Sequence, residues 1–268
     1  QVTVDGAVVD TVSTPVGFRT TTFTAGSSNF SQPPFTLNEK ALHLRGFSHH
    51  NSIGGLGVAI PERVELFRVQ ASRAMGSNTW RMSHNPYAPA LYELLDATGQ
   101  MCWDENRDYG AKYGGGAYAV AMRDMVKRDR NHPSVIMWSF CNEAECTQTD
   151  HDYSGLAFRA AAYGVDPTRP VAANGSPSQV PVAQVDVQGG SHWSSDKFVA
   201  AHKLNGTKPL VLSECCSCTS QRPDRDLPAC IADQNAPGRL PYVTGSLGVW
   251  TLMDYFGEPH GTGTSGWP

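Results

Sequence analysis

The chain has 268 residues, of which 40% are hydrophobic and 17% are charged, enough for one large domain with a sizeable core. Its formal net charge is −4 and it has no Lys/Arg-rich run, so we expect no nucleic-acid partner. No apolar stretch is long enough to span a bilayer, so we expect a soluble protein with no membrane partner.

Residues 1–37 differ from the rest of the chain. Short β-type runs at residues 20–23 and 35–37 are separated by segments rich in Gly, Ser, Asn and Pro. We expect this part to be the end of a β-sandwich domain or a lead-in hairpin. A second domain is expected over residues 38–268.

Strand and helix patterns alternate through this second domain. Turn signals such as Pro61 and Gly99 mark helix ends, and apolar periodicity marks helix interiors. We expect strands at residues 41–47, 79–83, 101–104, 135–140, 170–173, 185–188, 210–213 and 247–255. We expect helices at residues 61–75, 90–98, 117–128, 153–163 and 196–204. This α/β order predicts a (β/α)8 TIM barrel, and the short stretch after the last strand predicts that its final helix is lacking.

The most informative feature is a buried strand that ends in an Asn-Glu pair. Residues 135–140 are apolar on both faces, which is typical of a parallel strand inside a barrel. Asn142 and Glu143 come where this strand stops, and Glu214 comes where strand 210–213 stops. Catalytic groups of parallel barrels gather at the carboxyl ends of strands. Two carboxylates there are the minimum equipment for hydrolysing a glycosidic bond.

The chain has seven cysteines, and four of them fall between residues 215 and 230. Buried or free thiols, a zinc site and a loop disulfide that involves Cys230 are the alternatives. Zinc is the weaker one, because adjacent cysteines on a strand point to opposite faces. An odd number leaves at least one cysteine unpaired within the chain. Sequons at Asn29, Asn174 and Asn205 are compatible with a secreted protein.

Six motifs together resemble the catalytic barrel of glycoside hydrolase family 2, the family of β-galactosidases, β-glucuronidases and β-mannosidases. The most specific motif runs from Arg128 through the Asn-Glu pair, and the motifs follow the family's order over roughly residues 16–268. The others are Leu44-Arg45-Gly46 with His49-His50, residues 78–86, Trp103-Asp104-Glu105-Asn106, Ser213-Glu214 and residues 250–259. Full-length members carry a sugar-binding-like sandwich and an immunoglobulin-like domain before the barrel. Residues 1–37 resemble the last part of the second of these.

The resemblance implies a glycoside hydrolase with a retaining mechanism and gives each candidate residue a role. Glu143 would be the general acid/base, which must stay protonated near neutral pH. Glu214 would be the nucleophile that forms a glycosyl–enzyme ester, kept charged by Arg81. Asn142 would hydrogen-bond the sugar 2-hydroxyl. Further sugar contacts are expected from His50, His84, Trp250 and His192.

Several of these assignments have alternatives. His49 competes with His50 for the same role, His84 alternatively caps the following turn, and Trp250 alternatively packs in the core. Asp104 and Glu105 are expected to support the site from behind.

Two departures from the family pattern also matter. No tyrosine follows the sixth strand, so His192 or Trp193 takes the place of the family's tyrosine there. The family's Glu-x-His metal pair is replaced by Arg107-Asp108-Tyr109, so we predict no metal and no cofactor.

The sugar is inferred from residues 250–259, which resemble the galactosidase branch. The carboxylate-reading Asn-x-Lys of glucuronidases is not seen. We therefore expect an exo-acting enzyme on terminal β-D-galactosides. The alternatives are a β-glucuronidase, another β-glycosidase of the family, or a catalytically impaired sugar-binding fragment. We also expect a secreted, extracellular or lysosomal-type location, and further domains or a complementing chain as partners.

Overall fold

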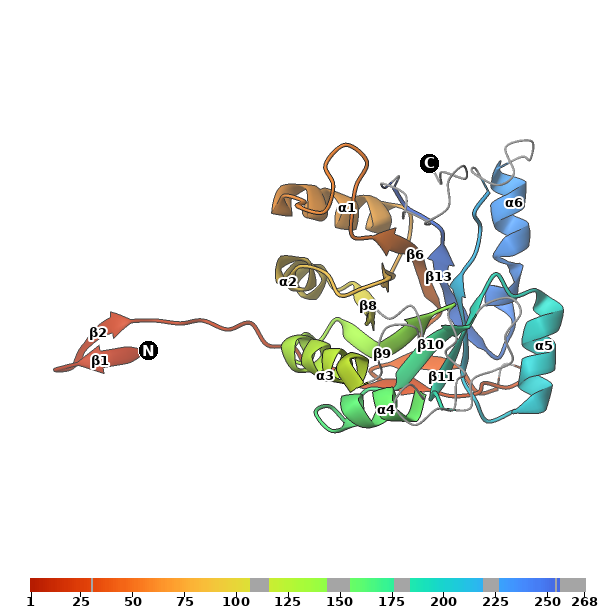
Figure 1. Cartoon of the computed structure of the whole chain (residues 1–268), viewed down its shortest axis with the longest axis horizontal. Coiled ribbons are helices and arrows are strands. Elements are labelled where there is room, and N and C mark those ends of the chain that lie inside the picture. Colours follow the sequence, from red (N-terminus) through yellow and green to blue (C-terminus); the bar gives the residue numbers. More distant parts are fainter. Residues whose placement is uncertain are drawn as a thin grey trace.

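The computed structural model describes residues 1–29, 31–106, 116–143, 155–175, 184–218, 227–253 and 255. Eight strands form a closed barrel in which each described pairing is parallel, which confirms the predicted TIM barrel (Figure 1). In chain order the strands are β6 (Leu44–His50), β7 (Thr79–Ser83), β8 (Met101–Glu105), β9 (Val135–Asn142), β10 (Val171–Gly175), β11 (Val187–Ser191), β12 (Leu210–Glu214) and β13 (Val243–Val249).

Helices surround the barrel (Figure 1). They are α1 (Glu62–Ala74), α2 (Pro89–Thr98), α3 (Gly116–Asp129), α4 (Gly155–Tyr163), α5 (Ser195–Leu204) and α6 (Leu227–Gln234), with a 3₁₀ helix η2 (Ala236–Arg239). Outward-facing strand residues such as Trp80, Trp138 and Phe140 are buried against α2, α3 and α4. Helix α2 ends at Gly99, which adopts the left-handed conformation that glycine tolerates best. None of the described helices is long and apolar enough to cross a membrane.

A small antiparallel sheet closes the amino-terminal end of the barrel. It consists of β3 (Thr21–Phe23), β4 (Phe35–Leu37) and β5 (Lys40–Ala41). Phe35 is fully buried among the side chains that fill the barrel interior, including Met101 and Trp103. The interior is therefore packed from this end, and polar groups that need access must lie at the opposite end.

A hairpin of β1 (Val2–Val4) and β2 (Ala7–Asp10) stands apart from the barrel at the amino terminus (Figure 1). Its residues are exposed, including Val2, Val4, Val8 and Val9. The assignment of residues 1–37 to the end of a sandwich domain stays a prediction.

Seven of the eight strands differ from their predicted bounds, and three of them differ most. The first begins at Leu44 instead of residue 41, the sixth spans Val187–Ser191 instead of 185–188, and the last spans Val243–Val249 instead of 247–255. The last strand was predicted to begin at residue 247, four residues after its observed start at Val243, because Gly245 resembles a turn residue. A Cβ atom at Gly248 would lie 2.4 Å from the backbone of Glu214, so glycine is required there by the close approach of β12 and β13. Helix α6 and η2 were also not predicted.

Candidate active site

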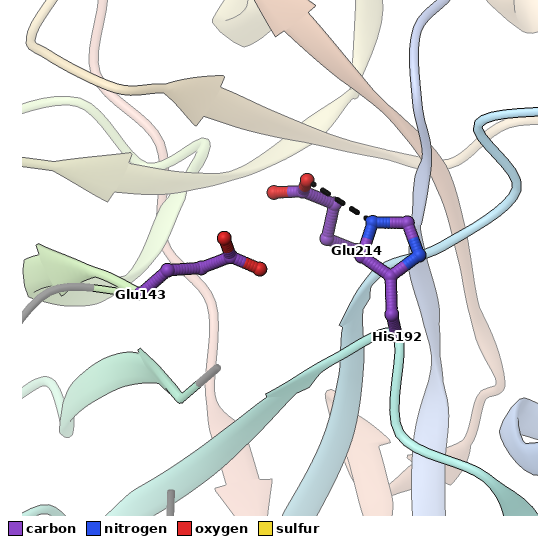
Figure 2. Close-up of side chains that lie close together, drawn as sticks. All are labelled: Glu143, His192 and Glu214. Carbon is purple, nitrogen blue, oxygen red and sulfur yellow. Dashed lines mark ion pairs between the residues drawn. The ribbon is translucent and has the colours of Figure 1, made fainter. Parts of the chain in front are cut away.

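Two glutamates point toward each other at the carboxyl ends of the barrel strands (Figure 2). Glu214 is the last residue of β12, and Glu143 directly follows β9. One carboxylate oxygen of each and one ring nitrogen of His192 lie within 4.8 Å of one another. Among the described residues, these three side chains also form the group that could hold a metal ion. Two carboxylates at this separation can equally act together on one glycosidic bond.

The backbone at two of these three residues is unusual. Glu143 has φ +51° and His192 has φ +50°, the left-handed region that residues other than glycine rarely adopt. Both residues come immediately after a barrel strand, so this conformation redirects the chain where the side chain enters the site. Such backbone strain persists where the surrounding structure enforces it, and it is concentrated at functional sites.

The carboxylate of Glu214 is held in its ionised form. Nη1 of Arg81 lies 2.7 Å from Oε2 of Glu214, and Nε2 of His192 lies 3.4 Å from Oε1. Burial by itself raises the pKa of this carboxyl, but the hydrogen bond from His192 and the charge of Arg81 outweigh it. The resulting pKa of Glu214 is about 2. Glu214 is therefore a carboxylate throughout the neutral range.

Arg81 joins four barrel strands around this carboxylate. It is fully buried on β7, and it donates to Glu105 at 3.0 Å, to Oδ1 of Asn142 at 2.7 Å and to Glu214. Burial lowers the pKa of Arg81, but Glu105 and Glu214 together raise it above its ordinary value. The guanidinium is thus a permanent cation whose nitrogen atoms are already engaged with the protein.

Glu105 supports the site as the sequence suggested, whereas Asp104 does not. Glu105 accepts hydrogen bonds from Nε1 of Trp103 at 2.9 Å and Oγ of Ser139 at 3.2 Å, and it lies 2.8 Å from Nδ1 of His84. Asp104 lies on the opposite face of β8, where it accepts from the hydroxyl of Tyr92 at 2.8 Å. Alternation along the strand places these neighbours on opposite sides of the barrel wall.

Asn174 is a site residue that the sequence reasoning assigned only to a sequon. It is fully buried on β10, so a glycan cannot be attached there. Its Nδ2 donates to Oδ1 of Asn142 at 2.6 Å, and its Oδ1 accepts a short hydrogen bond from the hydroxyl of Ser213. Its place at the carboxyl end of the fifth strand is the signal that could have identified it.

Aromatic rings form one wall of the site. Trp250 lies just beyond β13 and stacks on His84, with ring centroids 5.2 Å apart. His50 meets Trp250 edge-on at 6.4 Å and stacks on Tyr255 at 4.3 Å. Tyr255 was not predicted as part of the site. His49 instead stacks on Trp80 behind the strand, so the structure places His50 at the site.

The four cysteines between residues 215 and 230 form two disulfides and do not bind zinc. Cys218 and Cys230 form the loop disulfide, which confirms the expectation for Cys230, and Cys215 is bonded to Cys216. Zinc ligation by these thiols is therefore wrong. Adjacent side chains on a strand point to opposite faces, but Cys215 and Cys216 lie beyond the end of β12, and the φ of +71° at Cys216 lets their sulfurs meet. Cys102 is a buried free thiol.

Some sequence-based expectations lie outside the described residues. They include the segment Arg107-Asp108-Tyr109, on which the expected absence of a metal rested, and residues 254 and 256–259 of the last family motif.

Known proteins resemble this chain in sequence. The family profile described as "Glycosyl hydrolases family 2, TIM barrel domain" matches residues 30–221. The β-galactosidase BoGH2A of Bacteroides ovatus is 37% identical over 145 residues, which cover 50% of this chain and 16% of that protein. A putative β-glucuronidase of Formosa agariphila is 30% identical over 219 residues, covering 77% and 19%. The β-glucuronidase of Felis catus is 32% identical over 178 residues, covering 63% and 26%.

Solved structures give the same family. A glycosyl hydrolase family 2 member from Bacteroides cellulosilyticus matches with a TM-score of 0.73 and 29% identity, covering 94% of this chain and 33% of that chain. A β-glycosidase from Bacteroides vulgatus matches with a TM-score of 0.65 and 30% identity, covering 79% and 27%. The chain thus spans a third or less of the length of each of these relatives.

Proposed function

This chain belongs to glycoside hydrolase family 2, and we propose that it forms the catalytic barrel of a retaining exo-β-glycosidase that hydrolyses terminal β-D-galactosides. The observation that carries the proposal is the opposed pair Glu143 and Glu214, whose nearest ligand oxygens lie within 4.8 Å. Retaining glycosidases hold their two carboxyl groups about 5–5.5 Å apart, whereas inverting enzymes need about 6.5–9.5 Å to admit a water molecule. The observed separation supports retention.

Glu214 is the nucleophile in this proposal. Its pKa of about 2 keeps it ionised, because Arg81 and His192 both favour the charged form. The carboxylate attacks the anomeric carbon and forms a glycosyl–enzyme ester, which water later hydrolyses. Arg81 also bonds Asn142, so the nucleophile and the residue beside the acid/base share one anchor.

Glu143 is the general acid and then the general base. It is only partly buried, so a leaving group and later a water molecule can reach it. It protonates the departing oxygen in the first step and takes a proton from water in the second. Asn142 directly precedes Glu143, and its Oδ1 accepts hydrogen bonds from Arg81 and Asn174. Because its oxygen is held in this way, the side-chain nitrogen of Asn142 is directed to donate to the sugar 2-hydroxyl. Trp250 supplies an apolar face for the sugar ring.

A neutral sugar suits the described part of the site. A uronic acid needs a cation for its carboxylate, and the guanidinium of Arg81 is already bonded to Glu105, Glu214 and Asn142. A β-glucuronide is the second candidate, because the relatives from Formosa agariphila and Felis catus are named as a putative β-glucuronidase and a β-glucuronidase.

The Cys218–Cys230 disulfide supports an oxidising compartment, as expected for a secreted or lysosomal-type enzyme.

The test is a matched panel of 4-nitrophenyl glycosides. We expect kcat/KM for the β-galactoside to exceed that for the β-glucuronide about tenfold or more, a difference of about 1.4 kcal/mol in transition-state binding. NMR of the first product should show the β-anomer, and Glu214→Gln is the inactive control. A preference for the glucuronide would assign the second candidate. Background rates on every β-glycoside, or an α-anomer as first product, would overturn the proposal.

A further inference from the structure

Four cysteines follow the nucleophile within sixteen residues and have no role in the chemistry proposed above. All four are buried, with exposures between 1% and 4%, and they form the bonds Cys215–Cys216 and Cys218–Cys230. The first bond joins the two residues directly after Glu214. A covalent link at that point acts on the backbone that carries the nucleophile.

The peptide of Cys215 connects the nucleophile to the aromatic wall. Its N–H donates to the carbonyl of Gly248 at 2.6 Å, and its carbonyl accepts from the N–H of Trp250 at 2.8 Å. One residue before it, the carbonyl of Glu214 accepts from the N–H of His192 at 2.8 Å. The separation between Glu214 and Trp250 is therefore set through this single residue.

Cys216 makes the sharp turn that this arrangement requires. Its φ of +71° is left-handed, and its N–H donates to Oε1 of Gln234 on α6 at 2.8 Å. A residue other than glycine adopts this conformation only when its surroundings enforce it. The bond to Cys215 closes the two residues into a small ring, which restricts their backbone dihedrals in addition to the hydrogen bond from Gln234.

We propose that the Cys215–Cys216 disulfide is a positioning element that holds Glu214 and Trp250 at the spacing needed for hydrolysis, with Gln234 as its brace. The proposal rests on the proposed function of Glu214 and Trp250. Loss of the bond lets the segment after Glu214 relax. A misplacement of about 1 Å at a reacting group costs on the order of 10²-fold in rate, so kcat/KM is expected to fall between about 10-fold and 100-fold, mainly through kcat.

A cavity lies beside this bond. Cys215 lines a cavity of about 290 Å³ together with His192, Asp233 and Gln234. A water-soluble trialkylphosphine attacks one sulfur and breaks the S–S bond. Water then supplies the oxygen of the phosphine oxide and the two protons of the thiols, so one phosphine is oxidised for each disulfide reduced.

The experiment compares the wild type, Cys215→Ala/Cys216→Ala and the control Cys102→Ala, which removes an equally buried thiol from a different core cluster. Peptide mapping after alkylation without reduction establishes whether Cys215 and Cys216 are bonded. kcat and KM are measured with and without phosphine. Hydrogen–deuterium exchange at the amides of His192 and Trp250 reads the backbone position without any need for turnover.

We expect the double variant to lose kcat/KM by the stated factor, to exchange those amides about tenfold faster and to respond little further to phosphine. Cys102→Ala should respond to phosphine as the wild type does. The proposal is overturned if the two cysteines are alkylated in the unreduced protein, or if the double variant keeps kcat/KM within about twofold.

A third variant separates the bond from the turn. Cys215→Ala/Cys216→Gly accepts a positive φ without a Cβ penalty, so wild-type activity in this protein would show that the turn suffices and would also overturn the proposal. If the wild type hydrolyses no β-glycoside, the proposed function fails. The exchange rates then still decide whether the disulfide holds the segment.

Discussion

Replacing Glu214 by glutamine should destabilise the protein, although residues of active sites are often replaced without loss of stability. The reason is the environment of this carboxylate, which is 8% exposed and bonded to Arg81 at 2.7 Å. Its pKa is about 2, against an ordinary value of 4.5. At about 1.4 kcal/mol per pH unit, this difference corresponds to roughly 3 kcal/mol of stability at neutral pH.

The pH dependence follows from the sign of the pKa change. Because the folded-state pKa of Glu214 is lower than its unfolded-state value, the contribution is complete above about pH 4.5 and is lost as the pH falls toward about 2. Glu214→Gln should therefore lower the free energy of unfolding by roughly 2–3 kcal/mol at pH 7, and by progressively less below about pH 4.5.

Urea unfolding between about pH 7 and pH 3.5 measures this difference directly. Glu143→Gln is the matched control, since Glu143 is only partly buried and the same substitution there should change stability by less than about 1 kcal/mol. If Glu214→Gln proves as stable as the wild type at pH 7, or if its deficit does not shrink on acidification, the electrostatic reasoning is refuted.

Variants at three other positions test separate parts of the structure. Glu143→Gln should slow substrates with poor leaving groups most, and azide should partly rescue Glu143→Ala with formation of a β-glycosyl azide; an α-azide would contradict the assignment. Trp250→Ala should raise KM more than it lowers kcat, with about a tenfold loss of kcat/KM, and steady-state kinetics on a β-galactoside measures both. Burial and the neighbouring Asp129 raise the pKa of Asp104 well above its ordinary value. The unfolded chain therefore releases this proton more readily than the folded protein does, and stability falls as the pH rises. Asp104→Asn should therefore raise the Tm at pH 8 more than at pH 5, and an equal or opposite change in thermal melts would show that Asp104 is not held neutral.

The sequence by itself determined the barrel and the two carboxylates. Strand periodicity, helix signals and turn residues depend on neighbours in the chain, so they were readable without any tertiary contact. An Asn-Glu pair after one apolar strand and a Glu after another place three side chains at the carboxyl ends of strands, where a parallel barrel gathers its functional groups.

Tertiary structure alone decided which groups surround those carboxylates. Arg81 bonds Glu214 from 133 positions away in the sequence, and Asn174 reaches Asn142 across 32 positions. Such contacts exist only because closure of the barrel brings the ends of distant strands to one place. The bond between Cys215 and Cys216 could not be predicted from the sequence, for a related reason. Strand alternation separates adjacent side chains, and only the left-handed turn at Cys216, held by Gln234 of a distant helix, brings the two sulfurs together.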